Sequence, residues 1–293
     1  MDNLLQLVQS QSDLIKQLSH KIDTLEQSMY KLLNAYPFQA DLPAASLHPH
    51  KTTPLDHYTQ AFFTEHNIGY MGCIEEVVKS KTLDNIVLTM GNHFVDLQRW
   101  LLLIKRNVAS SGSFQIQLNE FKNPNIIIQV SEQLFKIAYL DEFALIKGGK
   151  QLLISPSRLP VAHNFFTGFW LERYIFLMID KVLKQFHLQE IALLYRNMVV
   201  TVPDVGNAEL DILLLINDTF FWIEIKSGDF QNYLTRYHQI KQELQFEQRQ
   251  CILVINENNF DIQNTIEQAS GFTVIGIQNF SQVFTAIIKS ISK

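Results

Sequence analysis

The first 35 residues carry apolar side chains at alternating spacings of four and three. These positions are Leu4, Val8, Gln11, Ile15, Leu18, Ile22, Leu25, Met29 and Leu32, and only Gln11 among them is polar. This period is typical of a parallel two-stranded coiled coil, in which one polar seam residue can fix the register. We therefore expect residues 1–35 to form a helix that makes a homodimer. The alternative is an amphipathic helix that packs on its own chain, because only about four heptads are present.

The pattern changes after this helix. Residues 36–54 contain four prolines and predict a linker. Residues 55–158 combine a long amphipathic segment over 83–107, a short alternating strand, a further helix, and a hairpin that turns at Gly148–Gly149. They predict a small, mostly helical domain. Its helix followed by a hairpin resembles a winged helix, and a packing or spacer domain is the other interpretation.

The pattern of residues 159–293 predicts an α/β (α+β) fold. A helix that is apolar around most of its circumference comes first, followed by three runs rich in β-branched, aromatic and aliphatic residues. An Asn217–Asp218 turn joins the second and third runs as a hairpin. Another helix and a buried strand follow. The expected core is a mixed sheet flanked by helices in the order αβββαβ.

Four charged residues interrupt these apolar segments. Glu172 lies in the apolar helix, Asp211 in the second strand, and Glu224 and Lys226 in the third. Side chains alternate along a strand, so Glu224 and Lys226 share a face. The hairpin places the strand of Asp211 opposite that of Glu224, but contact between the two carboxylates depends on the twist and on whether a bulge is present. A carboxylate in such surroundings is costly unless it is paired or binds a metal.

These residue types fit metal-dependent hydrolysis of a phosphodiester. A divalent cation polarises the phosphate and lowers the pKa of a bound water. Asp211, Glu224 and the carbonyl of Ile225 are the expected ligands of Mg²⁺ or Mn²⁺, and Lys226 would orient the attacking water and stabilise the developing charge. Glu172 would hold a second ion or bind the first through water. The alternatives are carboxylates that only form a salt bridge with Lys226, and a nuclease fold that has lost its activity.

The spacing D-x12-E-x-K resembles the signature of the PD-(D/E)xK nuclease superfamily. The strings GFWLE (168–172), NAELD (207–211) and WIEIKSG (222–228) are most similar to the C-terminal nuclease half of CRISPR ancillary nucleases, which couple such a core to a cyclic-oligonucleotide sensor (CARF) domain. The resemblance covers about residues 140 to 293 and implies a restriction-endonuclease-like core. The N-terminal part shows no doubly wound sensor pattern, so regulation by a cyclic nucleotide is not implied.

The helix after the third strand has three residues that could touch nucleic acid. In related nucleases this helix often supplies a polar or basic contact to the scissile phosphate, which implies such a role for Arg236 or Gln239, with Tyr237 beside them. A solvated helix face with aromatic packing is the alternative. Arg99, Lys105 and Arg106 form a second basic cluster, which by default is a solvated helix face.

Composition limits the function further. Lys and Arg number 24 against 29 Asp and Glu, for a formal charge of -5, so bulk electrostatics would not hold this chain on nucleic acid. Cys73 and Cys251 are far apart and lack a CxxC partner, which is typical of a reducing compartment. We see no secretory signal and no membrane-spanning run, and expect a cytoplasmic protein that does not bind membranes.

Together these patterns predict an Mg²⁺- or Mn²⁺-dependent endonuclease that uses direct attack by water. Its substrate would be DNA or RNA, which the sequence does not distinguish. An activating partner protein, as in a defence system, would make the enzyme active only in a complex. The rival interpretation is a catalytically silent scaffold or nucleic-acid-binding protein built on the same fold.

Overall fold

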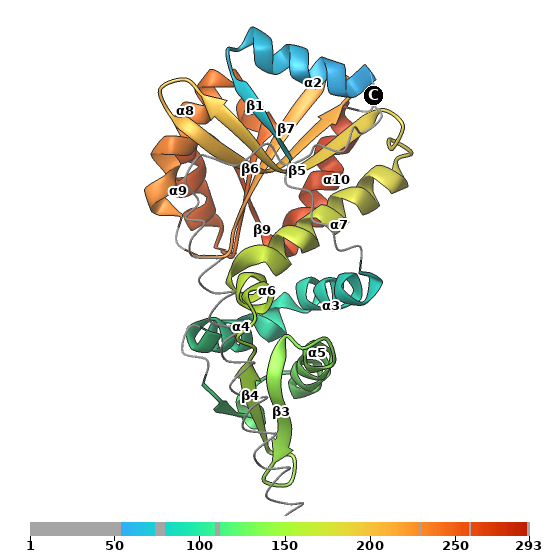
Figure 1. The fold of residues 1–293 in the computed structure, drawn as a ribbon, viewed down its shortest axis with the longest axis vertical. Coiled ribbons are helices and arrows are strands. Elements are labelled where there is room, and N and C mark those ends of the chain that lie inside the picture. The colour runs from blue at the N-terminus through green and yellow to red at the C-terminus, as the bar shows by residue number, and fades with distance from the viewer. Residues whose placement is uncertain (1–53, 74–79, 109–111, 229, 258, 292–293) are drawn as a thin grey trace, which may run out of the picture. The chain divides into compact units, whose positions relative to one another are not determined.

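A six-stranded mixed sheet is the centre of the C-terminal half of the chain (Figure 1). The computed structural model describes residues 54–73, 80–108, 112–228, 230–257 and 259–291. The strand order is β1-β5-β6-β7-β8-β9. Neighbours are antiparallel from β1 to β7, and β7, β8 and β9 are parallel. The strands are β1 (Gly69–Cys73), β5 (Ala192–Val202), β6 (Gly206–Ile216), β7 (Thr219–Lys226), β8 (Cys251–Ile255) and β9 (Thr273–Gly276).

The β6–β7 hairpin has the register that its turn predicts. Ile216 pairs with Thr219 across the Asn217–Asp218 turn. Asn217 has a positive φ of 51°, a conformation that asparagine tolerates better than most residues. Both strands are buried on both faces over most of their length, which explains why their sequences are nearly continuous apolar runs.

Helices cover both faces of this sheet (Figure 1). On one side, α8 (Leu234–Glu243) and α9 (Phe260–Ser270) enclose a core that contains Trp222, Tyr237 and Phe272. On the other side, α7 (Trp170–Gln185) and α10 (Phe280–Ile291) pack on a second, larger core. The expected sequence of helix, three strands, helix and strand is observed as α7, β5, β6, β7, α8 and β8.

The first described helix and strand join this sheet. In the sequence-based division, residues 55–73 belong to the small helical domain. In the structure, α2 (Pro54–Glu65) leads into β1, and β1 pairs with β5. The hydroxyl of Tyr195 on β5 donates a hydrogen bond to Asp56 of α2 over 2.8 Å. This edge of the sheet is therefore built from a segment more than a hundred residues away in the sequence.

The remaining N-terminal elements form a helical region with a small antiparallel sheet of order β2-β4-β3. The predicted hairpin is confirmed, with Gly148 and Gly149 at φ values of 66° and 80° in its turn. The predicted long amphipathic segment is divided at His93 into two helices. The elements are α3 (Lys81–Asn92), α4 (Phe94–Val108), β2 (Phe114–Gln117), α5 (Pro124–Lys136), β3 (Leu140–Ile146), β4 (Gln151–Pro156) and α6 (Pro160–Asn164).

The helical region and the large sheet share a hydrophobic core. Residues of α3, α4 and α5 belong to the same buried cluster as those of α7 and α10, and Thr52–Lys293 is one compact unit. Gly91 of α3 lies against the ring of Tyr174 of α7, so closely that a Cβ there would be 2.1 Å from Cε2 of that ring. The buried Arg173 of α7 also forms an ion pair with Asp84 of α3 over 2.7 Å. These contacts fix α3 relative to α7, which packs on the sheet.

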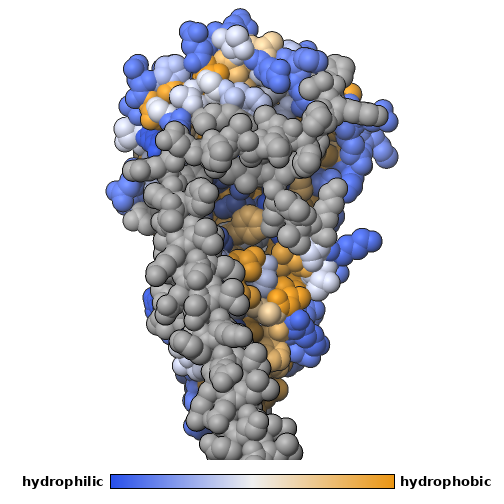
Figure 2. Space-filling view, viewed as in Figure 1, coloured by the Kyte–Doolittle hydropathy of each residue, from blue (hydrophilic) through white to orange (hydrophobic). Residues whose placement is uncertain are grey.

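Exposed apolar side chains occur in both parts of this unit. In the view of Figure 2, hydrophilic residues predominate in the upper part with some hydrophobic ones among them, and a hydrophobic patch lies lower down. Val95 and Val161 are exposed in the helical region, and Phe260 and Ile262 in the sheet region. Among the described residues, no helix is long and apolar enough to cross a membrane. The predicted coiled coil at 1–35 and the predicted linker before Pro54 lie outside the described residues.

Candidate active site

Asp211 and Glu224 meet where β6 and β7 stop pairing. The ladder runs from Ile216–Thr219 to Ile212–Ile223, and one further step in the same register places Asp211 opposite Glu224. Both side chains are buried, with exposed fractions of 8% and 2%. The sequence left open whether the two carboxylates come together, and in the structure both contact the same ammonium group, that of Lys226.

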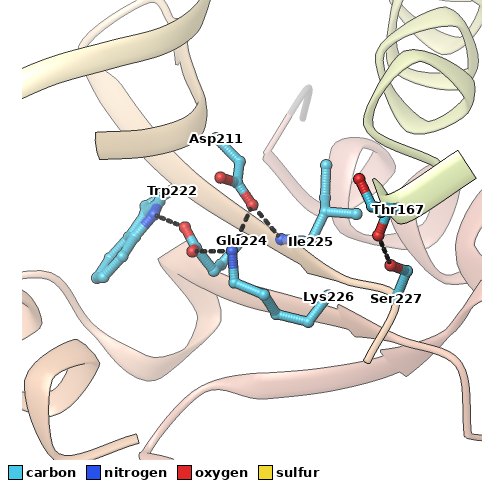
Figure 3. Close-up of polar contacts among 7 residues, drawn as sticks. All are labelled: Thr167, Asp211, Trp222, Glu224, Ile225, Lys226 and Ser227. Carbon is cyan, nitrogen blue, oxygen red and sulfur yellow. Dashed lines mark hydrogen bonds and ion pairs between the residues drawn. The ribbon is translucent and has the colours of Figure 1, made fainter. Parts of the chain in front are cut away.

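One ammonium group joins the two carboxylates. Nζ of Lys226 lies 2.7 Å from Oε1 of Glu224 and 3.2 Å from Oδ2 of Asp211 (Figure 3). Glu224 and Lys226 occupy alternate positions of β7 and share a face, as the strand period predicts. Three of the four predicted catalytic side chains are thus in direct contact.

Further hydrogen bonds orient both carboxylates. Oδ2 of Asp211 accepts a hydrogen bond from the backbone N–H of Ile225 over 2.7 Å, and Oε2 of Glu224 accepts one from the indole N–H of Trp222 over 3.1 Å (Figure 3). Hydrogen bonds from a strand backbone and from a fully buried ring leave these carboxylates little freedom to rotate. The protein's own hydrogen bonds therefore orient both carboxylates.

The neighbouring strand β5 is irregular at the same level. The β5–β6 pairing passes from Arg196–Ile212 to Met198–Leu210, and Asn197, which lies between these pairs, has a positive φ of 48°. In a regular strand, residues three apart point to opposite faces. Leu210 and Leu213 of β6 nevertheless both belong to the core on the α8 side. The alternation of side chains along β6 is therefore interrupted between them. A positive φ inside a strand is uncommon, and departures of this kind from regular backbone are frequent at functional sites.

The electrostatics of the cluster keep Lys226 charged. Burial and the Glu224 carboxylate raise the pKa of Asp211, against the opposing effects of Lys226 and the Ile225 N–H. Burial disfavours the Lys226 ammonium, but Glu224 and Asp211 outweigh it and hold the pKa of Lys226 above its ordinary value. Lys226 is therefore suited to donating hydrogen bonds and stabilising negative charge, not to acting as a general base.

Glu172 lies near this cluster but does not complete a three-carboxylate site. It is in the first turn of α7. A Cβ on Gly168 would be 3.9 Å from Oε1 of Glu172 and 3.5 Å from Oγ of Ser227, which follows Lys226 in sequence. Burial raises the pKa of Glu172, while Lys226 lowers it. Among the described residues, no group of three or more His, Cys, Asp or Glu side chains is arranged to hold one metal ion.

The three residues predicted to touch nucleic acid all lie on α8, and one of them reaches the carboxylate cluster. Tyr237 is buried, lies with its ring 5.9 Å from Nζ of Lys226, and packs edge-on against Trp222. Burial and Glu224 raise the pKa of Tyr237. Arg236 and Gln239 are exposed, and Arg236 donates a hydrogen bond to the backbone carbonyl of Asn207. Only Tyr237 is thus part of the cluster.

The site includes residues that the sequence analysis did not assign to it. Trp222 has a recognisable signal, because it precedes Glu224 by one strand period and Lys226 by two. The hydroxyl of Ser227 donates to the carbonyl of Thr167 over 2.8 Å (Figure 3) and accepts a hydrogen bond from Lys105 of α4 over 3.4 Å. No local pattern points to Lys105, because only the packing of α4 against the sheet region brings it here.

Comparisons with known proteins show a similarity of fold. The sequence matches no family model, and no curated protein matches it. Protein VC1899 from Vibrio cholerae is similar over 78% of this chain and 60% of its own, with a TM-score of 0.53 and 15% identity. Can2 from Sulfobacillus thermosulfidooxidans, determined in complex with cyclic tetra-adenylate (cA4), is similar over 78% of this chain and 57% of its own, with a TM-score of 0.54 and 12% identity. The chain therefore matches less than two thirds of the length of each.

Proposed function

We propose that this protein is a metal-dependent nuclease of the PD-(D/E)xK type. The observation that carries the proposal is the convergence of Asp211, Glu224 and Lys226 at the end of the β6–β7 ladder. Two buried carboxylates and one ammonium on adjacent strands, at the spacing D-x12-E-x-K, are the groups that phosphodiester hydrolysis requires. The order of the elements from α7 to β8 supports a restriction-endonuclease-like core, and the fold likeness to Can2 is consistent with it.

The donor set fits Mg²⁺ or Mn²⁺. Asp211 and Glu224 would supply carboxylate oxygens, which are hard ligands, and an ion that keeps several waters needs few protein ligands. The N–H of Ile225 points to Asp211, and the carbonyl of a strand residue faces the same neighbouring strand as its N–H, which supports Ile225 as a third ligand. Glu172 would act through water. When bound, the ion would polarise the phosphate and lower the pKa of a water molecule.

The protein's own residues would position the reacting groups. Lys226, held in the charged form, would donate to the attacking water or to a phosphate oxygen and stabilise the charge that develops there. Trp222 and the Ile225 N–H would keep the two carboxylates in their orientation. The hydroxyl of Ser227, the residue after Lys226, is engaged with the Thr167 carbonyl, which suits direct attack by water without a covalent enzyme intermediate.

A homodimer would extend this function. The heptads of residues 1–35 would bring two copies together, and two active sites could then cut two strands of DNA or RNA. The predicted dimer can be tested by light scattering on the full chain and on a chain that begins at Thr52, where the compact unit starts. We expect the full chain to have twice the mass of its monomer and the shortened chain to be monomeric.

The decisive experiment compares cleavage by the full-length protein and by Glu224→Gln. Labelled single- and double-stranded DNA and RNA would be incubated with Mn²⁺, Mg²⁺ or EDTA. Glutamine keeps the size of the side chain but removes the charge, and Asp180→Asn on α7, paired with Lys184 at the surface, is the matched control. We expect metal-dependent cutting by the wild type and the control, and none by Glu224→Gln. Cutting that survives both Glu224→Gln and Asp211→Asn would contradict the assignment.

Two further outcomes separate the rival functions. If the wild type cuts no substrate but Mn²⁺ raises its melting temperature, and Glu224→Gln removes that effect, the enzyme requires an activating partner. If Mn²⁺ has no effect on either protein, the fold is catalytically silent and the scaffold interpretation holds.

A further inference from the structure

A hollow of about 390 Å³ opens beside the carboxylate cluster. Lys226 and Tyr237 form one wall, and the chain at Thr167 and Ser227 forms another. Lys105, from α4 of the helical region, completes the lining. Two lysines from separate parts of the fold therefore face the same space.

The two lysines differ in how their charge is balanced. Lys226 is paired with two carboxylates. Lys105 donates a hydrogen bond to Oγ of Ser227 over 3.4 Å, and no carboxylate among the described residues forms an ion pair with it. The Lys105 side chain is half-buried, and this burial lowers its pKa. A cation in such surroundings is costly unless an anion accompanies it.

Ser227 fixes the direction of the Lys105 side chain. Its hydroxyl hydrogen is used in the 2.8 Å bond to the Thr167 carbonyl, so its oxygen is left to accept from Lys105. A Cβ on Gly228 would be 3.1 Å from Nζ of Lys105, so the absence of a side chain at Gly228 gives the ammonium its room. An ammonium has three N–H donors, and Ser227 uses one of them. The other two are available to a ligand in the hollow.

We propose that Lys105 is a phosphate-binding residue, which holds a phosphate of the nucleic acid strand next to the one that is cut at Lys226. The inference rests on the proposed nuclease function. A lysine binds phosphate as a point charge, and a chain with a net charge of -5 needs local cations to hold a polyanion. Tyr233, 48% exposed and stacked on Tyr237, lies at the same hollow and offers a ring on which a base of the bound strand can stack.

This assigns a role to the helical region. The buried apolar residues of α4 belong to the same core as those of α7, so the backbone that carries Lys105 is packed against the sheet region. The region then contributes to the binding site and is more than a spacer.

The test measures binding of labelled oligonucleotides to the full chain in EDTA, by fluorescence anisotropy over a range of salt concentrations. Lys105→Gln and Lys105→Met remove the charge, and Met keeps the apolar stem that packs on the protein. Arg106→Gln removes the same charge from the next, exposed position of α4 and is the control. Lys105→Arg keeps the charge. Melting temperatures would show that each variant is folded.

We expect Lys105→Gln and Lys105→Met to weaken binding by roughly five- to tenfold and to reduce the slope of log K against log salt by about 0.7–0.9, the effect of one phosphate contact. Lys105→Arg should retain most of the affinity, and Arg106→Gln should change it by less than about twofold. The proposal is overturned if both charge-removing variants match Arg106→Gln in affinity and slope, or if the wild type binds no oligonucleotide.

The readout separates this proposal from the nuclease proposal. Binding in EDTA needs no cleavage. The phosphate-binding role of Lys105 can therefore be confirmed or rejected even if the cleavage experiment finds no metal-dependent cutting that Glu224→Gln abolishes. Where cleavage occurs, Lys105→Gln should raise KM more than it lowers kcat, whereas Glu224→Gln should abolish kcat. A lower kcat with unchanged KM in Lys105→Gln would contradict a binding role.

Discussion

The backbone N–H of Ile225 donates a hydrogen bond to the side chain of Asp211, over 2.7 Å, just beyond the last pair of the β6–β7 ladder. A strand N–H at that position would ordinarily bond to the backbone of its neighbour. Here a carboxylate replaces the backbone acceptor, so Asp211 is anchored to the strand that carries Glu224 and Lys226. The end of the ladder is thus what brings the three charged groups together.

The charge of Lys226 is expected to matter more for turnover than for metal binding. Lys226→Met keeps most of the apolar stem of the side chain and removes the ammonium that bridges both carboxylates. We expect kcat to fall by about 10²–10³-fold, as for loss of a group that stabilises the transition state. Mn²⁺ affinity, measured by calorimetry, should be unchanged or tighter, because a competing cation is gone. Weaker metal binding with an unchanged kcat would refute this role.

Asp211 is expected to lower the stability of the metal-free protein at neutral pH. Because its pKa is raised in the fold, the folded state keeps a proton that the unfolded state has lost. Stability therefore falls as the pH rises from the ordinary aspartate value of about 3.9 through the raised pKa. Asp211→Asn does not titrate and leaves Lys226 paired with Glu224. In EDTA at pH 8 the variant should melt a few degrees higher, since about 1 kcal/mol shifts the melting temperature by roughly 2–4 °C.

The pH dependence distinguishes this effect from a general gain in stability. The advantage of Asp211→Asn should shrink as the pH falls below the ordinary aspartate value of about 3.9, where the wild-type carboxyl becomes protonated in both states. Asp180→Asn, at the surface, should show no such trend. A melting temperature of Asp211→Asn below that of the wild type at every pH would show that the carboxylate stabilises the fold.

The close contact between α3 and α7 predicts the effect of a single added methyl group. Alanine usually stabilises a helix relative to glycine by about 1 kcal/mol. At Gly91, however, the new Cβ would be 2.1 Å from the ring of Tyr174, so the helices must move apart. We expect Gly91→Ala to reduce the free energy of unfolding by about 1–3 kcal/mol, measured with urea. In a Tyr174→Ala background the same change should cost nothing, and an equal cost in both backgrounds would contradict the contact.

The thiol of Cys251 is expected to be unreactive in the folded protein. It is fully buried at the start of β8, and burial raises its pKa to about 12, so the reactive thiolate is scarce at neutral pH. In a Cys73→Ser variant, a thiol reagent at pH 8 should label the protein only after urea unfolds it. Rapid labelling in the folded state would show that β8 is not buried as described.

The sequence determined most local elements of this protein. The apolar runs and the Asn217–Asp218 turn predicted β5 to β7, and the apolar helix and the Gly148–Gly149 hairpin were also found where predicted. Their signals are periodicity and turn chemistry, which act between residues close in the chain. The candidate cluster could be predicted for the same reason, because Glu224 and Lys226 are two residues apart and a tight hairpin brings Asp211 near them.

Tertiary structure alone decided which distant segments complete the sheet and the site. β1 pairs with β5, Gly91 packs on Tyr174, and Lys105 reaches Ser227. In each case the partners are more than eighty residues apart, and no local pattern distinguishes them from other apolar or basic residues. Such pairings follow from the burial of one shared core, whose free energy is summed over many side chains. The sequence therefore specified the carboxylates and the lysine, while the packing of α4 against the sheet region determined what surrounds them.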